Sequence, residues 1–216
     1  MISENFNHHL RIQLLYCGIL SSVLYCAMAV FTAASWPEYD STAQTVSELS
    51  AIGAPTRTVW ILLAIPYACL IAAFGIGIIA SAKSSRNIRI LGRLIFSYAL
   101  FCLFWPPMHL RSVLAAGGST ISDTLHILFT VITVVLMIAS IYIAASEFGK
   151  VFRAYSILTI ITLMVFGVLT GIQAPNVHAN LPTPLMGVWE RINIGVFLLW
   201  IIVLSFVVQK RIKIGI

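Results

Sequence analysis

Apolar residues fill six long stretches of this chain, and short polar segments separate them. A helix needs about 20 mostly apolar residues to cross a bilayer. We expect six membrane-spanning helices, over residues 14–34, 59–82, 91–108, 125–145, 155–172 and 188–208. Helices are expected because backbone groups in hydrocarbon must find hydrogen-bond partners inside their own segment. The pattern predicts an all-α membrane protein, a six-transmembrane-helix bundle that forms one domain over residues 1–216.

Composition and charge place this bundle in a membrane and give it an orientation. The chain is 60% hydrophobic and 9% charged, whereas a soluble domain has about a quarter charged residues. Of the 13 Lys and Arg, all but Arg57, Arg111 and Arg191 fall in the termini or in the two short connections near 83–93 and 150–153. Basic residues favour the cytoplasmic side, so we expect both termini on that side. We expect the protein to lie in the cell (cytoplasmic or inner) membrane.

The net charge of +6 therefore reflects membrane topology and contact with anionic lipids. The basic residues are divided among separate short segments, which argues against a nucleic-acid partner. Membrane lipids are the expected partners.

The first connection on the opposite side, 35–57, contains a short amphipathic segment. The run Ser-Thr-Ala-Gln at 41–44 matches a capping box. After it, apolar residues recur at every third position, 43, 46, 49 and 52, and Gly-Ala-Pro at 53–55 would end a helix. We expect a short helix on the membrane surface or over the mouth of the bundle, and a plain connector is the alternative.

Ionisable residues gather at the ends of the predicted spans on this outer side. We expect them to line an outward-facing polar pocket that contains Glu48, His109, Arg111, Asp123, His126, Glu190 and Arg191. Asp123 and His126 are three residues apart and share one helix face. The two prolines at 106–107 are expected to end the third helix or to leave carbonyl groups free.

Two interpretations of these residues compete. In the structural one, Asp123 caps a helix and pairs with His126 or Arg111. In the functional one, His109, Asp123 and His126 bind a metal ion or transfer protons. Glu190 and Arg191 point about 100° apart on a helix. One of them is expected to form an ion pair across the bundle, with Asp123, His126 or Glu48, while the other reaches the interface.

The order of these motifs resembles a bacterial and archaeal membrane family, domain of unknown function 998 (DUF998). The motifs are Thr-Val-Ser-Glu-Leu-Ser-Ala-Ile-Gly-Ala-Pro at 45–55, Phe-Trp-Pro at 104–106, Asp-Thr-Leu-His at 123–126, and Gly-Val-Trp-Glu-Arg at 187–191. The resemblance covers about residues 30–208 and implies a multi-span membrane protein without an assigned activity. Family members often have an acidic residue soon after the Phe-Pro element, where this chain has His109.

Ser47, His109, Asp123 and His126 also have a weak similarity to membrane hydrolases of the alkaline ceramidase and adiponectin-receptor group. The chain lacks the late HxxxH pair of that group on its last span, which puts zinc in doubt.

Three functions follow from these observations. The first is a non-enzymatic protein that binds or moves a lipid or small amphiphile. The second is a metal-dependent hydrolase of lipid amides or esters, with Glu48 and Asp123 as candidate catalytic residues and Glu48 as general base. In it, zinc would be the cofactor, held by His109, Asp123 and His126. The third is a membrane scaffold subunit without a ligand.

Overall fold

The computed structural model describes residues 2–214, and nearly all of the regular structure is helical. In chain order the elements are α1 (Ile2–Ala34), the 3₁₀ helix η1 (Val46–Ser50), α2 (Arg57–Ala80), α3 (Arg86–Leu103), α4 (Arg111–Ala115), α5 (Ile121–Ala145), α6 (Gly149–Ile172), α7 (Ala174–His178) and α8 (Met186–Ile214). The all-α prediction is confirmed for this part of the chain.

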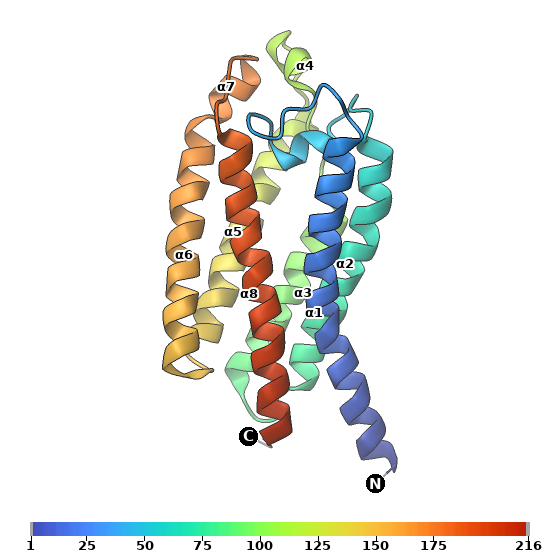
Figure 1. Cartoon of the computed structure of the whole chain (residues 1–216), viewed down its shortest axis with the longest axis vertical. Helices are drawn as coiled ribbons and strands as arrows, with labels where there is room; N and C mark the ends of the chain where they lie inside the picture. Colours follow the sequence, from blue (N-terminus) through green and yellow to red (C-terminus); the bar gives the residue numbers. More distant parts are fainter. Residues whose placement is uncertain (1, 215–216) are drawn as a thin grey trace.

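The long helices close into a ring that follows the order of the chain. Helix α1 packs beside α2, α2 beside α3, α3 beside α5, α5 beside α6, and α6 beside α8, which returns to α1. Short connections favour this antiparallel arrangement of neighbours. Both termini lie at one end of the bundle, here called the terminal end, while η1, α4 and α7 lie at the other, the roof end (Figure 1).

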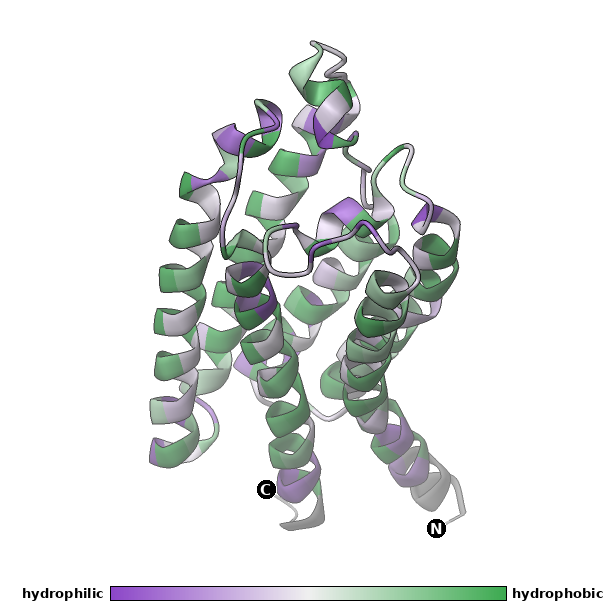
Figure 2. Ribbon diagram, turned by 45° about the horizontal axis from the view of Figure 1, so that its top comes forward, coloured by the Kyte–Doolittle hydropathy of each residue, from purple (hydrophilic) through white to green (hydrophobic). Residues whose placement is uncertain are grey.

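In the part of the chain that the structure describes, five helices are long and apolar enough to cross a membrane: His8–Ala34, Arg57–Ala80, Ile121–Ala145, Gly149–His178 and Met186–Ile212. Hydrophobic residues cover most of their length (Figure 2). These spans make the chain a multi-span membrane protein. The predicted third span forms the helix α3, which differs from the other five because Arg86, Arg89 and Arg93 lie in its first two turns.

Two prolines end α3 earlier than we expected. The helix stops at Leu103 rather than at residue 108, since a proline disfavours helical backbone in the preceding residue and donates no hydrogen bond. The carbonyl groups freed in this way find side-chain donors on α5. Ser122 Oγ donates to Pro107 O at 2.6 Å, and His126 Nδ1 lies 2.9 Å from Pro106 O. Of the two alternatives for the double proline, the end of the third helix is confirmed, and the carbonyl groups of Pro106 and Pro107 are hydrogen-bonded rather than free.

Large side chains fill the centre of the ring. Trp200 and Phe197 of α8 are stacked, and Phe197 also contacts Tyr98 of α3 across the bundle. At the wall, α2 and α3 approach closely. A Cβ atom on Gly75 would lie 2.9 Å from the backbone oxygen of Gly92, so both positions require glycine for this packing. These contacts give the ring rigid walls.

The helix in the first connection differs from the expected amphipathic helix in where it starts and in its type. The capping box is made by Thr45 and Glu48, four residues after the one we expected from Ser41, and the helix it starts is the five-residue η1. Its apolar residues Val46 and Leu49 are buried, and so is the acidic Glu48. Because both faces are covered, η1 packs into the mouth of the bundle and does not lie on a membrane surface.

Candidate functional site

Glu48 forms the most buried ion pair at the roof end. Its side chain has 0% exposure and accepts two hydrogen bonds from Arg111, from Nε to Oε2 and from Nη2 to Oε1, both at 2.7 Å. The Thr45 backbone N–H and hydroxyl also donate to Oε1. This two-bond geometry is the strongest that arginine and a carboxylate can form. The pair joins η1 to the segment that precedes α5.

Arg111 also connects the roof to the α7–α8 connection. Its Nη1 donates to Thr183 Oγ1 at 2.6 Å, and its Nη2 donates to Ala43 O at 3.1 Å. The Thr183 hydroxyl donates to the same Ala43 carbonyl at 2.7 Å. One guanidinium thus binds two segments that are distant in the sequence, 43–48 and the α7–α8 connection, which fixes their relative positions.

Glu190 and Arg191, at the start of α8, hold the segment 39–50, here called the roof loop. Glu190 Oε2 accepts a short hydrogen bond from the Val46 backbone N–H. Arg191 Nη1 donates to the carbonyl oxygens of Ser41 at 2.7 Å and Gln44 at 3.1 Å. The expected ion pair of these residues with Glu48, Asp123 or His126 is wrong, because both side chains bind the backbone of the roof loop. Glu48 takes Arg111 as its partner.

Tyr39 completes this set of bonds. Its hydroxyl donates to Thr45 O at 2.7 Å and accepts from Arg191 Nη2 at the same distance. Burial raises the pKa of Tyr39, although the positive charge of Arg191 acts in the opposite direction. The hydroxyl therefore stays protonated and works as a hydrogen-bond donor.

Gly187 lets the roof loop lie directly on α8. Its N–H donates to Thr42 O at 2.9 Å, and a Cβ atom at this position would overlap the carbonyl oxygens of Gln44 and Ser41. The loop could not occupy this place if residue 187 carried a side chain.

His109 and Asp123 form a second polar pair near the roof end. Asp123 accepts from the His109 backbone N–H at 2.7 Å, and its other oxygen lies 2.9 Å from His109 Nδ1. The same carboxylate accepts from the Thr120 N–H and so caps α5. The predicted capping role is confirmed, but the partner of Asp123 is His109, not His126 or Arg111.

His126 is directed to a different partner. Its Nδ1 bonds to the Pro106 carbonyl, and its ring packs edge-on against Trp105. Within residues 2–214, no three His, Cys, Asp or Glu side chains are grouped so that they could hold a metal ion. The proposed zinc ligands His109, Asp123 and His126 therefore do not form a ligand set in this arrangement.

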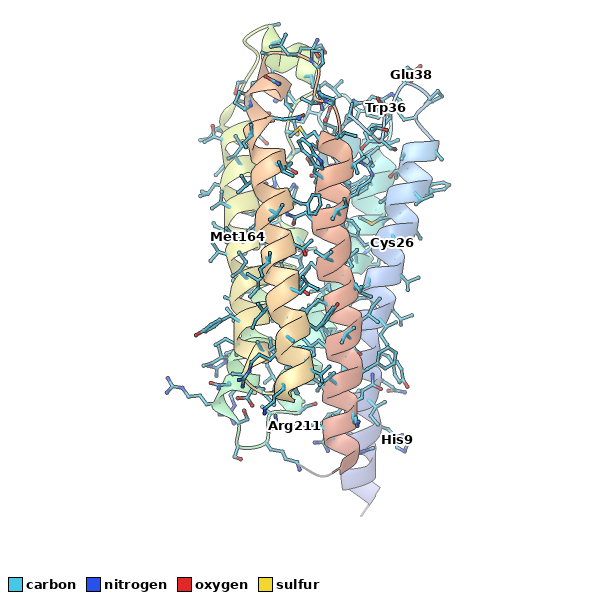
Figure 3. All side chains as sticks on the ribbon, turned by 60° about the vertical axis from the view of Figure 1, so that its left-hand side comes forward. His9, Cys26, Trp36, Glu38, Met164 and Arg211 are labelled. Atoms are coloured by element: carbon cyan, nitrogen blue, oxygen red, sulfur yellow. The ribbon has the colours of Figure 1, made fainter. Side chains whose placement is uncertain are left out.

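A groove lies beside the roof, between α1 and α8. It has a volume of about 480 Å³, and its walls include Cys26, Ala29 and Ala33 of α1 and Ile194 and Leu198 of α8. A second hollow of about 310 Å³ shares Cys26, Gly195 and Leu198 with the first, so the two form one groove that extends to Ile202. Cys26 lies on α1 where that helix runs beside α8 (Figure 3).

The groove has a polar end under the roof loop and apolar walls elsewhere. Ser41 and Arg191 lie at the polar end. Among the ion pairs of the described residues, none gives Arg191 a carboxylate partner, since it donates to carbonyl groups and to Tyr39. Its positive charge is therefore not neutralised by a direct contact. Of the seven predicted site residues, Arg191 is the one that lines this groove. Glu48, Arg111 and Glu190 bind groups of the roof, His109 and Asp123 bind each other, and His126 contacts Pro106 and Trp105.

Comparison with known proteins gives one match. A family model described as "Protein of unknown function (DUF998)" matches residues 19–207, which include the roof loop and all but the ends of the helix ring. The chain belongs to the DUF998 family. No curated protein and no solved structure matches it.

Several residues that shape this DUF998 protein were missed in the sequence. Tyr39 and Thr183 bind the roof, and Cys26 and Gly195 line the groove. For the groove, the small side chains at 26, 29 and 33 on one face of α1 were a signal, because little side-chain volume projects from the helix there. For Tyr39 and Thr183 the sequence holds no comparable signal, because each acts through partners far along the chain.

Proposed function

We propose that this protein binds a membrane lipid or small amphiphile in the α1–α8 groove, with an anionic headgroup at Arg191. The observation that carries the proposal is the polarity of the groove. An unneutralised guanidinium stands at one end, and apolar side chains form the rest of the walls. An anionic amphiphile has the same division between a charged head and an apolar chain.

The proposal includes a position in the membrane. Helix α3 would be the sixth span, since it lies in the ring between α2 and α5 and its 18 residues extend roughly 27 Å, close to the roughly 30 Å of the hydrocarbon core. The excess of basic residues puts the terminal end on the cytoplasmic side. The roof and the polar end of the groove would then face outward.

The dimensions of the groove suit one hydrocarbon chain. From Arg191 to Ile202 the axis of α8 advances roughly 16 Å, at about 1.5 Å per residue. The side chains beside the groove on its outer edges, Val23, Val30 and Leu199, are more than half exposed. In a bilayer these residues would contact lipid, so an acyl chain could enter the groove sideways without passing through the bundle.

The polar residues of the roof support this function indirectly. Glu48 and Arg111 fix η1, while Glu190 and Arg191 fix the roof loop above the groove. The side-chain atoms of Glu48, Arg111 and Glu190 are used by bonds within the protein, which favours a role in holding the roof over direct contact with a ligand. The hydrolase hypothesis receives less support, because its three zinc ligands are not gathered.

A test fills the groove without disturbing its backbone. A Cβ atom on Gly195 meets nothing within 4 Å, and the same is true of Gly171 on α6, away from the groove. We expect Gly195→Trp to lose most of the lipid that wild-type protein retains through purification in mild detergent, measured by mass spectrometry. The control Gly171→Trp should retain the wild-type amount. Equal lipid retention in both variants, with both folded, would contradict the proposal.

A further inference from the structure

Three arginines, Arg86, Arg89 and Arg93, lie at the terminal end of α3 and are here called the arginine stripe. These residues are all exposed and follow one another at spacings of three and four. At about 100° per residue they fall within roughly 60° of the helix circumference and extend about 10 Å along its axis. They form one continuous cationic edge.

The opposite face of α3 is rigidly held in the bundle. Ile88, Leu91 and Ile95 are buried, and Gly92 touches the backbone of α2. The stripe therefore points away from the ring, toward the surroundings of the protein. A helix packed so closely cannot turn its arginines inward.

Within residues 2–214, the side chains of Arg86 and Arg93 have no hydrogen-bond or ion-pair partner, and the Arg89 side chain donates one bond to the Lys83 carbonyl. The carboxylate of Glu147 lies at the same end of the bundle, but Arg211, Asn87 and Ser85 occupy it. The stripe thus carries positive charge that the contacting protein groups do not neutralise.

We propose that the arginine stripe binds the phosphate groups of anionic phospholipids in the cytoplasmic leaflet. This inference rests on the proposed position of α3 as a span, not on the groove. An arginine about 10 Å inside a span must reach toward the headgroups, and its long apolar stem permits that. Arginine forms two-bond contacts with phosphate oxygens, and anionic lipids concentrate at this surface. A phospholipid phosphate supplies the counter-charge that the protein lacks.

The test removes the two arginines that have no protein partner. Delipidated protein would be titrated with phosphatidylglycerol or with phosphatidylcholine of the same acyl chains, and bound lipid counted by native mass spectrometry. We expect Arg86→Gln/Arg93→Gln to weaken phosphatidylglycerol binding roughly tenfold, with phosphatidylcholine binding unchanged. Arg86→Lys/Arg93→Lys keeps the charge and should recover most of the binding.

The matched control is Lys150→Gln/Lys210→Gln, which removes the same charge from exposed positions at the same end. It should change phosphatidylglycerol binding less than the double arginine variant does, because Lys150 and Lys210 lie on different helices and lysine contacts phosphate as a point charge without the two-bond geometry of arginine. Equal losses in the two double variants, or no loss in either, would overturn the proposal. The titration would be repeated with Gly195→Trp added to each variant. Because a filled groove cannot bind lipid, the lipid that remains bound reports on the arginine stripe alone.

Discussion

The two ends of the helix ring carry their charges in different ways. At the roof end, Glu48 is fully buried and Arg111 surrounds its carboxylate, so the charges are neutralised within the protein. At the terminal end, Arg86 and Arg93 are exposed, and no carboxylate among the described residues 2–214 contacts them. Buried charges must be paired because water cannot solvate them. The difference indicates that the Glu48–Arg111 pair maintains the fold, whereas the exposed arginines of α3 act on the surroundings.

The largest effect is expected from breaking the roof ion pair. Arg111→Ala leaves the Glu48 carboxylate buried and unpaired, which should cost about 3–5 kcal/mol of stability. The double variant Glu48→Gln/Arg111→Met removes both charges and should lose less than Arg111→Ala alone. Thermal unfolding in detergent micelles measures both. If Arg111→Ala unfolded at the wild-type temperature, the roof charges would not be structural.

The next prediction compares two glycines of α8, Gly187 beneath the roof loop and Gly195 in the groove. Gly187→Ala places a Cβ atom against the carbonyl oxygens of the roof loop, while Gly195→Ala places one in open space. We expect Gly187→Ala to destabilise the protein by about 1–3 kcal/mol. Gly195→Ala should be neutral or slightly stabilising, because alanine favours helix by up to about 1 kcal/mol over glycine. The same unfolding assay would refute this account if the two variants behaved alike.

A smaller loss is expected at the His109–Asp123 pair. Asp123→Asn keeps the shape of the side chain but weakens both the helix cap and the bond to His109. The expected cost is about 1–2 kcal/mol. Amide hydrogen exchange in the first turn of α5 should rise with it, and unchanged exchange there would show that Asp123 does not hold the start of this helix.

The smallest effect on stability is expected at the terminal end. Arg86→Gln/Arg93→Gln removes two charges that bind no group of residues 2–214, so unfolding in a zwitterionic detergent should change by no more than about 0.5 kcal/mol. A loss of the size seen for Arg111→Ala would mean that the two ends are alike, and the comparison above would fail.

How much of this could be read from the sequence depends on the range of the interaction. The spans follow from local apolar runs and were predictable, whereas α3 ends at Leu103, earlier than its apolar run indicates, because of the two prolines that follow. The capping box was misplaced because Ser41 and Thr45 both precede a matching residue three positions later, and only packing selects Thr45. Local patterns therefore gave the elements but not the choice between similar starts.

Partners across the bundle were not predictable. Arg111 and Glu48 are 63 positions apart, and nothing in their spacing distinguishes this pair from Arg191 with Glu48. The groove likewise needs two helices from opposite ends of the chain. Small residues on α1 become a cavity wall only when α8 lies beside them, because helix order around a ring is a property of the packed structure.

The central claim is that the α1–α8 groove binds an amphiphile, and saturable photolabelling tests it most directly. Protein in phosphatidylcholine bilayers would be labelled with phosphatidylglycerol that carries a diazirine in its acyl chain, with and without excess unlabelled phosphatidylglycerol. We predict adducts on groove residues such as Cys26 and Leu198 that the unlabelled lipid suppresses, while adducts on the exposed face of α6, at Leu158 or Val165, persist. Adducts of equal density on both faces, without suppression, would contradict the claim.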